Sequence, residues 1–297
     1  MDNSARIEAA LEAAIAAQEG PEGPPRLAAA IRHSVFPGGA RIRPHLTLAV
    51  AQACGADDID LAAAAGAAIE LMHCASLVHD DLPCFDNATT RRGRPSVFGA
   101  YGERLAVLAG DALIVTAFQS LAVAAAQKPD RMGPLLGTLA AGVAAPSGIV
   151  AGQAWECEPR VALTAYQRAK TGALFVAATV AGAQAAGAAF APWRALGEWL
   201  GEAYQVADDI RDVALDPEQL GKPGGQDAAL GRPSSAAELG LSGAIQYFDQ
   251  LIAYASASIP SCRGSAQLRT LVRQESRRLV PVELTRKLLP SVTRISA

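Results

Sequence analysis

The sequence predicts a single all-α domain, and three observations carry that prediction. Alanine-rich runs with Leu, Ile or Val at spacings of three and four residues recur along the chain, as in helices that bury one face. Alternating apolar and polar runs of any length, which would indicate strands, are missing from the sequence. Hydrophobic residues make up 51% of the chain and aromatic residues only 5%, so we expect a core of small aliphatic side chains.

The expected helices follow one another along the chain with short breaks. In order, they cover residues 4–18, 25–34, 45–54, 58–79, 103–127, 134–145, 164–188, 191–213, 234–240 and 242–258. Most breaks contain Gly or Pro, which end helices. The clearest are PEGPP (21–25), FPGG (36–39), CGADD (54–58), QKPDRMGP (127–134), APSG (145–148) and SIPSCRG (258–264).

The longest irregular stretch is LDPEQLGKPGGQDAALGRPSS, residues 215–235, which is rich in Gly and Pro. Helical pattern lies on both sides of it, so we expect a functional surface loop rather than a linker. No repeat, low-complexity tract or domain boundary interrupts the pattern elsewhere. Residues 1–297 are therefore predicted to form one domain.

Composition and charge exclude several classes of protein. A formal net charge of −3 gives no reason to expect nucleic acid as a partner. The cysteines are odd in number, scattered and without a C-x-x-C pair, which argues against a disulfide framework or a zinc site. They are Cys54, Cys74, Cys84, Cys157 and Cys262. This pattern suits reduced thiols in a cytoplasm.

The sequence predicts neither a signal peptide nor a transmembrane segment. Its first residues, MDNSARIEAALEAAIAAQEG, lack the basic and then apolar profile of a signal peptide. Residues 172–193 could mimic a membrane span, but their apolar character rests mainly on Ala and Gly, and Gln184 interrupts it. We expect a buried helix there, because small residues let helices approach closely. The protein is therefore expected to be soluble and cytoplasmic.

A first acidic cluster lies in LVHDDLPCFDNATTRRG, residues 77–93. Asp80 and Asp81 close an apolar helix that Pro83 must end, and Asp86 follows in the same short loop. The C-terminus of a helix carries partial negative charge, which disfavours carboxylates there. These acids therefore indicate a nearby cation, and a solvated turn is the alternative interpretation. Asp oxygens without Cys or suitably spaced His suit a hard ion such as Mg²⁺.

A second acidic cluster lies in GEAYQVADDIRDV. On a helix, Asp208, Asp209 and Asp212 occupy neighbouring faces, and Gln205 lies one turn before the first two. A solvated surface face, with Arg211 as a partial counter-charge, is the alternative interpretation. Two similar clusters on apolar helices favour carboxylates that hold several Mg²⁺ ions around a phosphate-bearing ligand.

Basic residues supply the complement of such a site. Arg91 and Arg92 follow the first cluster, and the planar guanidinium suits phosphate oxygens. Lys170 and Thr171 are expected at the start of a helix, where free N–H groups also favour an anion. Further basic residues stand in glycine-rich segments: Arg41, Arg43, Lys222 and Arg232. Together with the acidic clusters they outline a diphosphate site.

The motifs as a set resemble the trans-type polyprenyl diphosphate synthases. In chain order they are GGARIRP, HDDLPCFDN with RRG, GQAWE, AKTGAL, QVADDIRD and LGKPGGQD. HCASLVHDDLPCFDN, AVLAGDAL and SIPSC are most similar to bacterial geranylgeranyl diphosphate synthases of carotenoid and bacteriochlorophyll pathways. The resemblance implies a helical bundle of the isoprenoid synthase type with a central cavity between the two Asp motifs, a homodimer, and chain elongation of allylic diphosphates.

The resemblance also implies how the residues divide between metal and substrates. Three Mg²⁺ ions per site would bridge the allylic diphosphate, held by Asp80, Asp81, Asp86, Asp208, Asp209 and Asp212. The diphosphate of the allylic substrate (dimethylallyl, geranyl or farnesyl) would be held by Arg91, Lys170 and Lys222. Isopentenyl diphosphate would be held by Arg43, His73 and Arg92. Oxygens facing the allylic cation would come from Gln153, Thr171 and Gln205.

Four positions depart from the family pattern. Ala40 replaces a lysine that elsewhere binds isopentenyl diphosphate, and Phe98 replaces a frequent histidine. Glu156 and Arg232 replace an aspartate and a lysine and keep the charge. The two replacements that keep the charge are expected to matter little, whereas Ala40 is expected to affect the affinity for isopentenyl diphosphate.

Product length is expected to depend on the helix before Asp80. Ala75 and Ser76, four to five residues earlier, would line a tunnel for the growing chain. Both are small, whereas family members that stop at fifteen carbons carry an aromatic residue at the position of Ala75. Met72 and Phe118 are candidates for the side chains that close the far end of this tunnel. The expected product is geranylgeranyl diphosphate, with farnesyl diphosphate as the alternative.

Two other functions remain open from the sequence. A non-catalytic partner subunit of a related synthase would be expected to lose acidic motifs, and both are intact here. A terpene cyclase needs an Asp-rich cluster but not a second diphosphate site of Arg43, His73 and Arg92.

Overall fold

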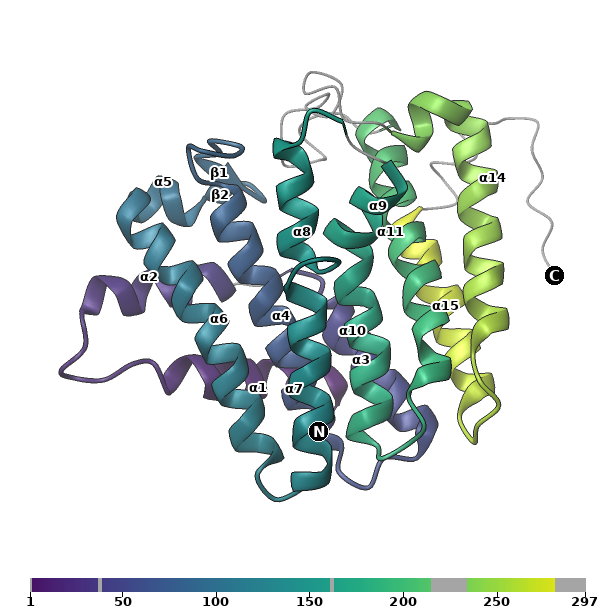
Figure 1. Ribbon diagram of the computed structural model, residues 1–297, viewed down its shortest axis with the longest axis horizontal. Helices are drawn as coiled ribbons and strands as arrows, with labels where there is room; N and C mark the ends of the chain where they lie inside the picture. Colours follow the sequence, from purple (N-terminus) through teal and green to yellow (C-terminus); the bar gives the residue numbers. More distant parts are fainter. Residues whose placement is uncertain (1, 37–38, 161–162, 215–233, 281–297) are drawn as a thin grey trace.

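The computed structural model describes residues 2–36, 39–160, 163–214 and 234–280 (Figure 1). Within these ranges the chain is almost entirely helical, which confirms the predicted fold class. The α-helices are α1 (Asn3–Ala16), α2 (Pro25–Val35), α3 (Ile42–Cys54), α4 (Ile59–Asp80), α5 (Val97–Tyr101), α6 (Glu103–Ala125), α7 (Pro129–Val143), α8 (Ile149–Ala154), α9 (Leu163–Gln167), α10 (Ala173–Ala185), α11 (Arg194–Ala214), α14 (Ser235–Ser258) and α15 (Ser265–Leu279). Short strands β1 (Thr90–Arg91) and β2 (Arg94–Pro95) pair in antiparallel register after α4.

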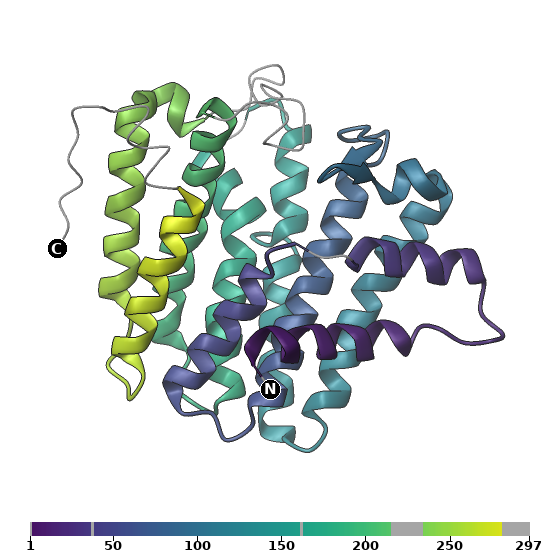
Figure 2. The same cartoon turned by 180° about the vertical axis from the view of Figure 1, so that it is seen from behind.

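Most of the longer helices run side by side in one bundle, and α1 and α2 cross its back (Figures 1 and 2). Helices α4 and α10 form the interior: α4 packs on α1, α3, α6 and α10, and α10 also packs on α7 and α11. Both are apolar on nearly every side and buried over most of their length. The acid-bearing ends of α4 and α11 lie at one end of the bundle, where β1 and β2 also lie.

Small residues bring the central helices together, as the sequence predicted for residues 172–193. A Cβ added to Gly182 of α10 would lie 2.5 Å from the carbonyl oxygen of Thr47 in α3. The polar residue of that segment, Gln184, is buried and accepts a hydrogen bond from Thr138 Oγ1 at 2.9 Å. Glycine and alanine therefore permit a backbone contact that larger side chains would prevent.

The structure differs from the expected helix boundaries in three places. The helix expected to begin at residue 134 begins at Pro129, since proline is favoured in the first turn, and it tolerates Pro134 inside. Residues 164–188 are interrupted by a π-helical turn at Arg168–Gly172. Residues 234–258 form α14 with a kink at Gly240, whose φ is +68°.

Three helices were missing from the sequence prediction. Helices α5 and α8 have five and six residues, too few for an apolar period to be recognised. Helix α15 carries only a narrow apolar stripe, and its buried residues include Leu268 and Val272.

Two helices in the described ranges are long and apolar enough to cross a membrane, and neither is the segment that the sequence singled out. They are α4 and α6, whose most apolar stretches are 78% and 39% buried. Residues 172–193 contain a helix of only 13 residues. A buried core helix of a soluble protein passes the same test, so α4 is explained by its place in the interior.

Candidate active site

A cavity of about 1060 Å³ opens at the end of the bundle that carries the acidic motifs. Its walls come from α3, α4, the turn after α4, α6, α7, α8, α9, the π-helical turn, α10 and α11. Charged residues of both motifs line it, and side chains of α4, α6 and α7 add an apolar wall that includes Met72, Ile114 and Val143. The cavity thus joins an ionic region to an apolar one.

The turn after α4 brings two carboxylates of the first motif to the cavity. The backbone N–H of Asp86 donates to the carbonyl oxygen of Asp80 at 2.9 Å, which folds the loop back on the helix end. Asp80 and Asp86 both line the cavity. Burial raises the pKa of Asp80, the Asp86 charge adds to this rise, and the Lys170 ammonium opposes it. Oδ1 of Asp80 is buried without a hydrogen-bond partner.

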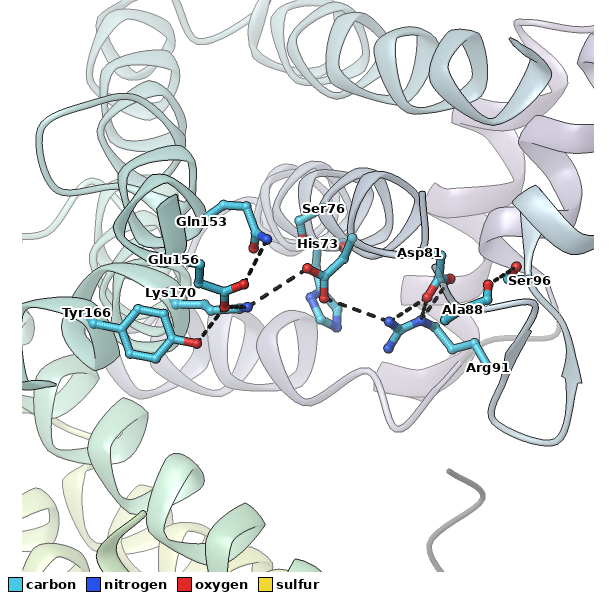
Figure 3. A network of polar contacts seen from close by, with 11 residues as sticks. His73, Ser76, Asp81, Ala88, Arg91, Ser96, Gln153, Glu156, Tyr166 and Lys170 are labelled. Atoms are coloured by element: carbon cyan, nitrogen blue, oxygen red, sulfur yellow. Dashed lines mark hydrogen bonds and ion pairs between the residues drawn. The ribbon is translucent and has the colours of Figure 1, made fainter. Parts of the chain in front are cut away.

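Asp81 lies behind this pair and holds Arg91. Its carboxylate is only 2% exposed and accepts from Arg91 Nε at 2.9 Å and pairs with Arg91 Nη2 at 2.7 Å (Figure 3). The same Nη2 lies 3.8 Å from Asp80 Oδ2. Asp81 does not line the cavity, whereas Arg91 does. The first motif therefore places a guanidinium beside the acids that line the cavity.

The acids of the second motif also divide into one that lines the cavity and two that do not. Asp208 lines the cavity and pairs with Arg211, one turn later on α11. Asp209 is 3% exposed, and neither Asp209 nor Asp212 lines the cavity. Gln205 lines it, and its Oε1 accepts a hydrogen bond from Thr171 Oγ1 at 2.9 Å.

Lys170 reaches the cavity from the π-helical turn, and the expectation that it starts a helix is wrong. Helical structure already begins at Leu163, so the N–H groups near Lys170 are not those of a helix start. Such wide turns are frequent at functional sites. Helix α8 crosses the turn closely, since a Cβ on Gly152 would lie 2.4 Å from Lys170 Cα.

A network around Glu156 orients the Lys170 ammonium (Figure 3). Lys170 Nζ pairs with Glu156 and lies 3.9 Å from Asp80 Oδ1. The Tyr166 hydroxyl donates to Glu156 at 2.7 Å, and Gln153 Nε2 donates at 3.3 Å. The glutamate that replaces the family aspartate therefore still anchors the lysine.

A second group of cations lies on another wall of the cavity. Arg43 is 7% exposed, its guanidinium carbon lies 4.9 Å from the Phe175 ring centroid, and its Nε has no hydrogen-bond partner. Burial lowers the pKa of Arg43. The guanidinium of Arg92 lies against Gly39, where a Cβ would meet Nη1 at 2.4 Å. Arg43, His73 and Arg92 all line the cavity, and the two guanidinium groups have the geometry to bind an anion.

Arg41, which the sequence grouped with Arg43, points elsewhere. It is 5% exposed and pairs with Glu70 at 3.1 Å and with Glu8 at 2.9 Å. Its Nη2 also donates to the carbonyl oxygen of Val35 at 2.8 Å. Arg41 therefore joins α1, α2 and α4 and is not available to a substrate.

The predicted chain-length residues line the cavity, with one exception. Met72, Ala75 and Ser76 all face it from α4. Phe118 does not, since the lining of α6 ends at Ile114, one turn earlier. His79 and Asp111, which were not predicted as site residues, also line the cavity, and His79 Nε2 lies 3.8 Å from Asp111 Oδ1.

The donor set fits divalent cations that share their coordination with a bound ligand. Among the described residues no three His, Cys, Asp or Glu side chains are grouped as a ready metal site. Asp80 and Asp208 nevertheless line one cavity, and the buried Oδ1 of Asp80 has no hydrogen-bond partner to replace water. Lys222 lies outside the described residues.

His73 predicts a pH-dependent contribution to stability. Burial, and then the Arg43 and Arg92 charges, hold the pKa of His73 well below its usual 6.5. The unfolded chain binds this proton first as pH falls, so acidification below about pH 6.5 should lower the free energy of unfolding. His73→Gln should make urea unfolding less sensitive to pH between about 7 and 5. Equal pH slopes for both proteins would contradict this assignment.

The fold and the site define an all-α enzyme of the isoprenoid synthase class. A sequence profile described as polyprenyl synthetase matches residues 24–256, and the chain belongs to that family. The chain is 54% identical to a geranylgeranyl diphosphate synthase of Cereibacter sphaeroides, covering 94% of this chain and 97% of that protein. It is 50% identical to the geranylgeranyl diphosphate synthase of Rhodobacter capsulatus, covering 93% and 96%. These findings confirm the resemblance stated from the motifs.

Solved structures agree with this class. A geranyltransferase from Helicobacter pylori, complexed with magnesium and isoprenyl diphosphate, superposes with a TM-score of 0.77 at 29% identity over 94% of this chain and 98% of that one. An FPP/GFPP synthase from Zymomonas mobilis gives 0.76 at 30% identity over 92% and 96%.

Proposed function

We propose that this protein is a Mg²⁺-dependent geranylgeranyl diphosphate synthase, which condenses isopentenyl diphosphate with allylic diphosphates. The observation that carries the proposal is the buried Oδ1 of Asp80, which has no hydrogen-bond partner and lies 3.9 Å from Lys170 Nζ, in a cavity that Asp208 also lines and that has an apolar wall. The high identity to two bacterial enzymes of that name over nearly the whole chain supports the twenty-carbon product. Farnesyl diphosphate is the alternative product.

The allylic diphosphate is assigned to the Asp80 side of the cavity. Asp80, Asp86 and Asp208 would hold the ions, which number three in the proposal, with Asp81, Asp209 and Asp212 in support. When bound, Mg²⁺ neutralises the charge of the leaving diphosphate. Arg91 and Lys170 lie beside Asp80 and would bind the same diphosphate oxygens as the bond to carbon breaks. Lys222 is proposed to join them.

Isopentenyl diphosphate is assigned to Arg43, His73 and Arg92. Arg43 is held against Phe175 and Tyr204, with ring centroids 4.9 and 5.9 Å away, so its guanidinium is oriented before any ligand binds. His73 is neutral at pH 7 because its pKa is low, so it can donate only one N–H to a phosphate oxygen. The two substrates therefore bind through separate sets of residues.

Oxygens near Lys170 would face the allylic cation. Gln153, Thr171 and Gln205 line the cavity. The isopentenyl double bond attacks the cation, a proton is lost from the adduct, and the released diphosphate takes that proton. The described cavity lining therefore needs no separate general base.

Ala40→Lys tests whether the missing lysine weakens the second substrate site. Ala40 is exposed and follows Gly39, against which Arg92 lies. A new charge-assisted contact is typically about 1.5–3 kcal/mol, so KM for isopentenyl diphosphate should fall by about tenfold while KM for the allylic substrate is unchanged. Ala40→Gln is the uncharged control. An unchanged KM would assign the role to Arg92, because Arg41 is paired with Glu70 and Glu8.

Radiolabelled isopentenyl diphosphate distinguishes the proposed enzyme from the two alternatives. Incorporation into longer prenyl diphosphates should require an allylic diphosphate and Mg²⁺ and should stop in EDTA. A non-catalytic partner subunit would incorporate no label, and a terpene cyclase would release diphosphate from the allylic substrate alone. Either result would overturn the proposed function.

Helix α6 supports the proposal that the protein is a homodimer. Its exposed face carries Leu108, Val115 and Val123, with relative exposures from 50% to 71%. At 3.6 residues per turn, Leu108, Val115 and Val123 fall within about 80° of one another around the helix axis, and such an apolar stripe is typical of an interface. A second copy that covers the stripe would remove these apolar side chains from water. We also propose that the protein is soluble and cytoplasmic.

Val115→Glu should therefore weaken the dimer, because it buries a charge in an apolar contact. Light scattering after size exclusion should give a mass near that of one chain at micromolar concentration. Glu103→Gln, at the start of the same helix, is a control that should remain dimeric. A wild-type monomer would contradict the homodimer.

A further inference from the structure

The carboxylate of Asp209 lies between two helices rather than in the cavity. It is 3% exposed and accepts a hydrogen bond from the backbone N–H of Ser235 at 2.7 Å. Ser235 is the first residue of α14, and the N-cap residue Ser234 makes no side-chain capping bond of its own. A carboxylate of α11 therefore caps the start of α14, where the helix dipole favours a negative charge.

The same carboxylate begins a hydrogen-bond chain that ends at the cavity. Gln205 lies one turn before Asp209 on α11, and its Nε2 donates to Asp209 Oδ1 at 3.1 Å. Its Oε1 accepts from Thr171 Oγ1 at 2.9 Å. Gln205 and Thr171 line the cavity, and Asp209 does not. The chain thus connects the cavity wall to the buried end of α14.

The chemistry of Asp209, Gln205 and Thr171 decides which group donates and which accepts in each of these hydrogen bonds. An ionised carboxylate only accepts hydrogen bonds, so Gln205 must turn its NH₂ group toward Asp209 and its carbonyl oxygen toward Thr171. The Thr171 hydroxyl must then donate its proton to Gln205. Its lone pairs, and not its proton, are left for the cavity.

We propose that Asp209 is a positioning residue that sets this direction, so that Thr171 presents lone pairs to a positive charge in the cavity. The inference rests on the proposed function, because only a reaction through an allylic cation makes the polarity of Thr171 important. It also separates Asp209 from Asp208: Asp208 faces the cavity and the ions, and Asp209 acts through Gln205.

Asp209→Asn tests the direction without removing the cap. Asparagine is isosteric and still offers one oxygen to the Ser235 N–H, but its NH₂ group would face the Gln205 NH₂ group. The Gln205 amide must then turn over, and the Thr171 hydroxyl proton becomes free to point into the cavity. We expect kcat to fall by about tenfold or more, because the polarity of a group near a charge is reversed.

Binding measurements separate this role from metal ligation. Mg²⁺-dependent affinity for a non-ionising thio analogue of farnesyl diphosphate should be nearly unchanged in Asp209→Asn, since no cation forms. The matched variant Asp208→Asn should weaken that affinity at least about tenfold, since it removes a charge facing the ions. Equal loss of analogue binding in both variants would make Asp209 a metal ligand and overturn the inference.

A double-mutant cycle completes the test. Because Asp209 acts through Gln205, the double variant Asp209→Asn with Gln205→Leu should turn over no more slowly than Gln205→Leu alone. Additive losses, or a wild-type kcat for Asp209→Asn, would overturn the inference while leaving the proposed function intact. A wild-type protein without turnover would instead overturn the proposed function, and this inference with it.

Discussion

Asp80→Asn and Asp208→Asn are each expected to lower turnover by about a thousandfold or more, with little change in helicity. The reason is electrostatic: both carboxylates line the cavity, and each amide removes a negative charge that would hold a divalent cation. The folded state should tolerate the changes, since Asp80 Oδ1 makes no hydrogen bond and Asp208 is 42% exposed. Steady-state rates and far-ultraviolet circular dichroism measure the two effects.

A carboxylate remote from the cavity provides the matched control. Asp130 is on α7, its side chain is 77% exposed, and it does not line the cavity. Asp130→Asn should retain wild-type turnover. Near-normal rates for Asp80→Asn or Asp208→Asn, or full wild-type activity in EDTA, would rule out a mechanism with two acidic metal-binding motifs.

Ala75→Phe is expected to change the product from twenty to fifteen carbons. Ala75 lines the cavity on α4, about one turn before Asp80, and is 1% exposed to solvent. A phenyl ring there would enter the cavity and block the growing chain, and the acids at the mouth would be left in place. Turnover should therefore persist, and mass spectrometry of the products should report the shorter chain.

The neighbouring position controls for general disturbance of α4. Ser76 also lines the cavity, and its hydroxyl donates to the carbonyl oxygen of His73 at 2.8 Å. Ser76→Ala changes polarity but adds no volume, so the twenty-carbon product should remain. An unchanged product from Ala75→Phe would mean that the chain does not pass Ala75.

The sequence predicted which acids lie close together more reliably than which groups each acid contacts. Spacing on a helix is enough to place Asp208 and Asp209 near one another. It cannot tell that Asp208 faces a cavity while Asp209 accepts from Ser235, because that depends on where α14 packs. Likewise, the sequence cannot tell that Asp80 lines the cavity while Asp81 pairs with Arg91, because only the fold brings Arg91 back to Asp81.

The fold was predictable where helices are long and apolar, and less so where tertiary packing decides. The pattern of residues 58–79 and 103–127 corresponds closely to α4 and α6. The π-helical turn at Arg168–Gly172 has no sequence signal, yet it sets the position of Lys170 against α8. The separation of Arg41 from Arg43 likewise follows from Glu70 and Glu8, which lie on other helices.

A single turnover from farnesyl diphosphate tests the central claim most directly. The protein, in excess over farnesyl diphosphate, is mixed with isopentenyl diphosphate and Mg²⁺, and the quenched product is identified by mass spectrometry. A cavity of about 1060 Å³ that is lined by Met72, Ala75 and Ser76 should admit the fifteen-carbon chain. We predict geranylgeranyl diphosphate as the main product. Farnesyl diphosphate recovered without extension, by a protein that extends dimethylallyl or geranyl diphosphate, would contradict the assignment as a twenty-carbon synthase.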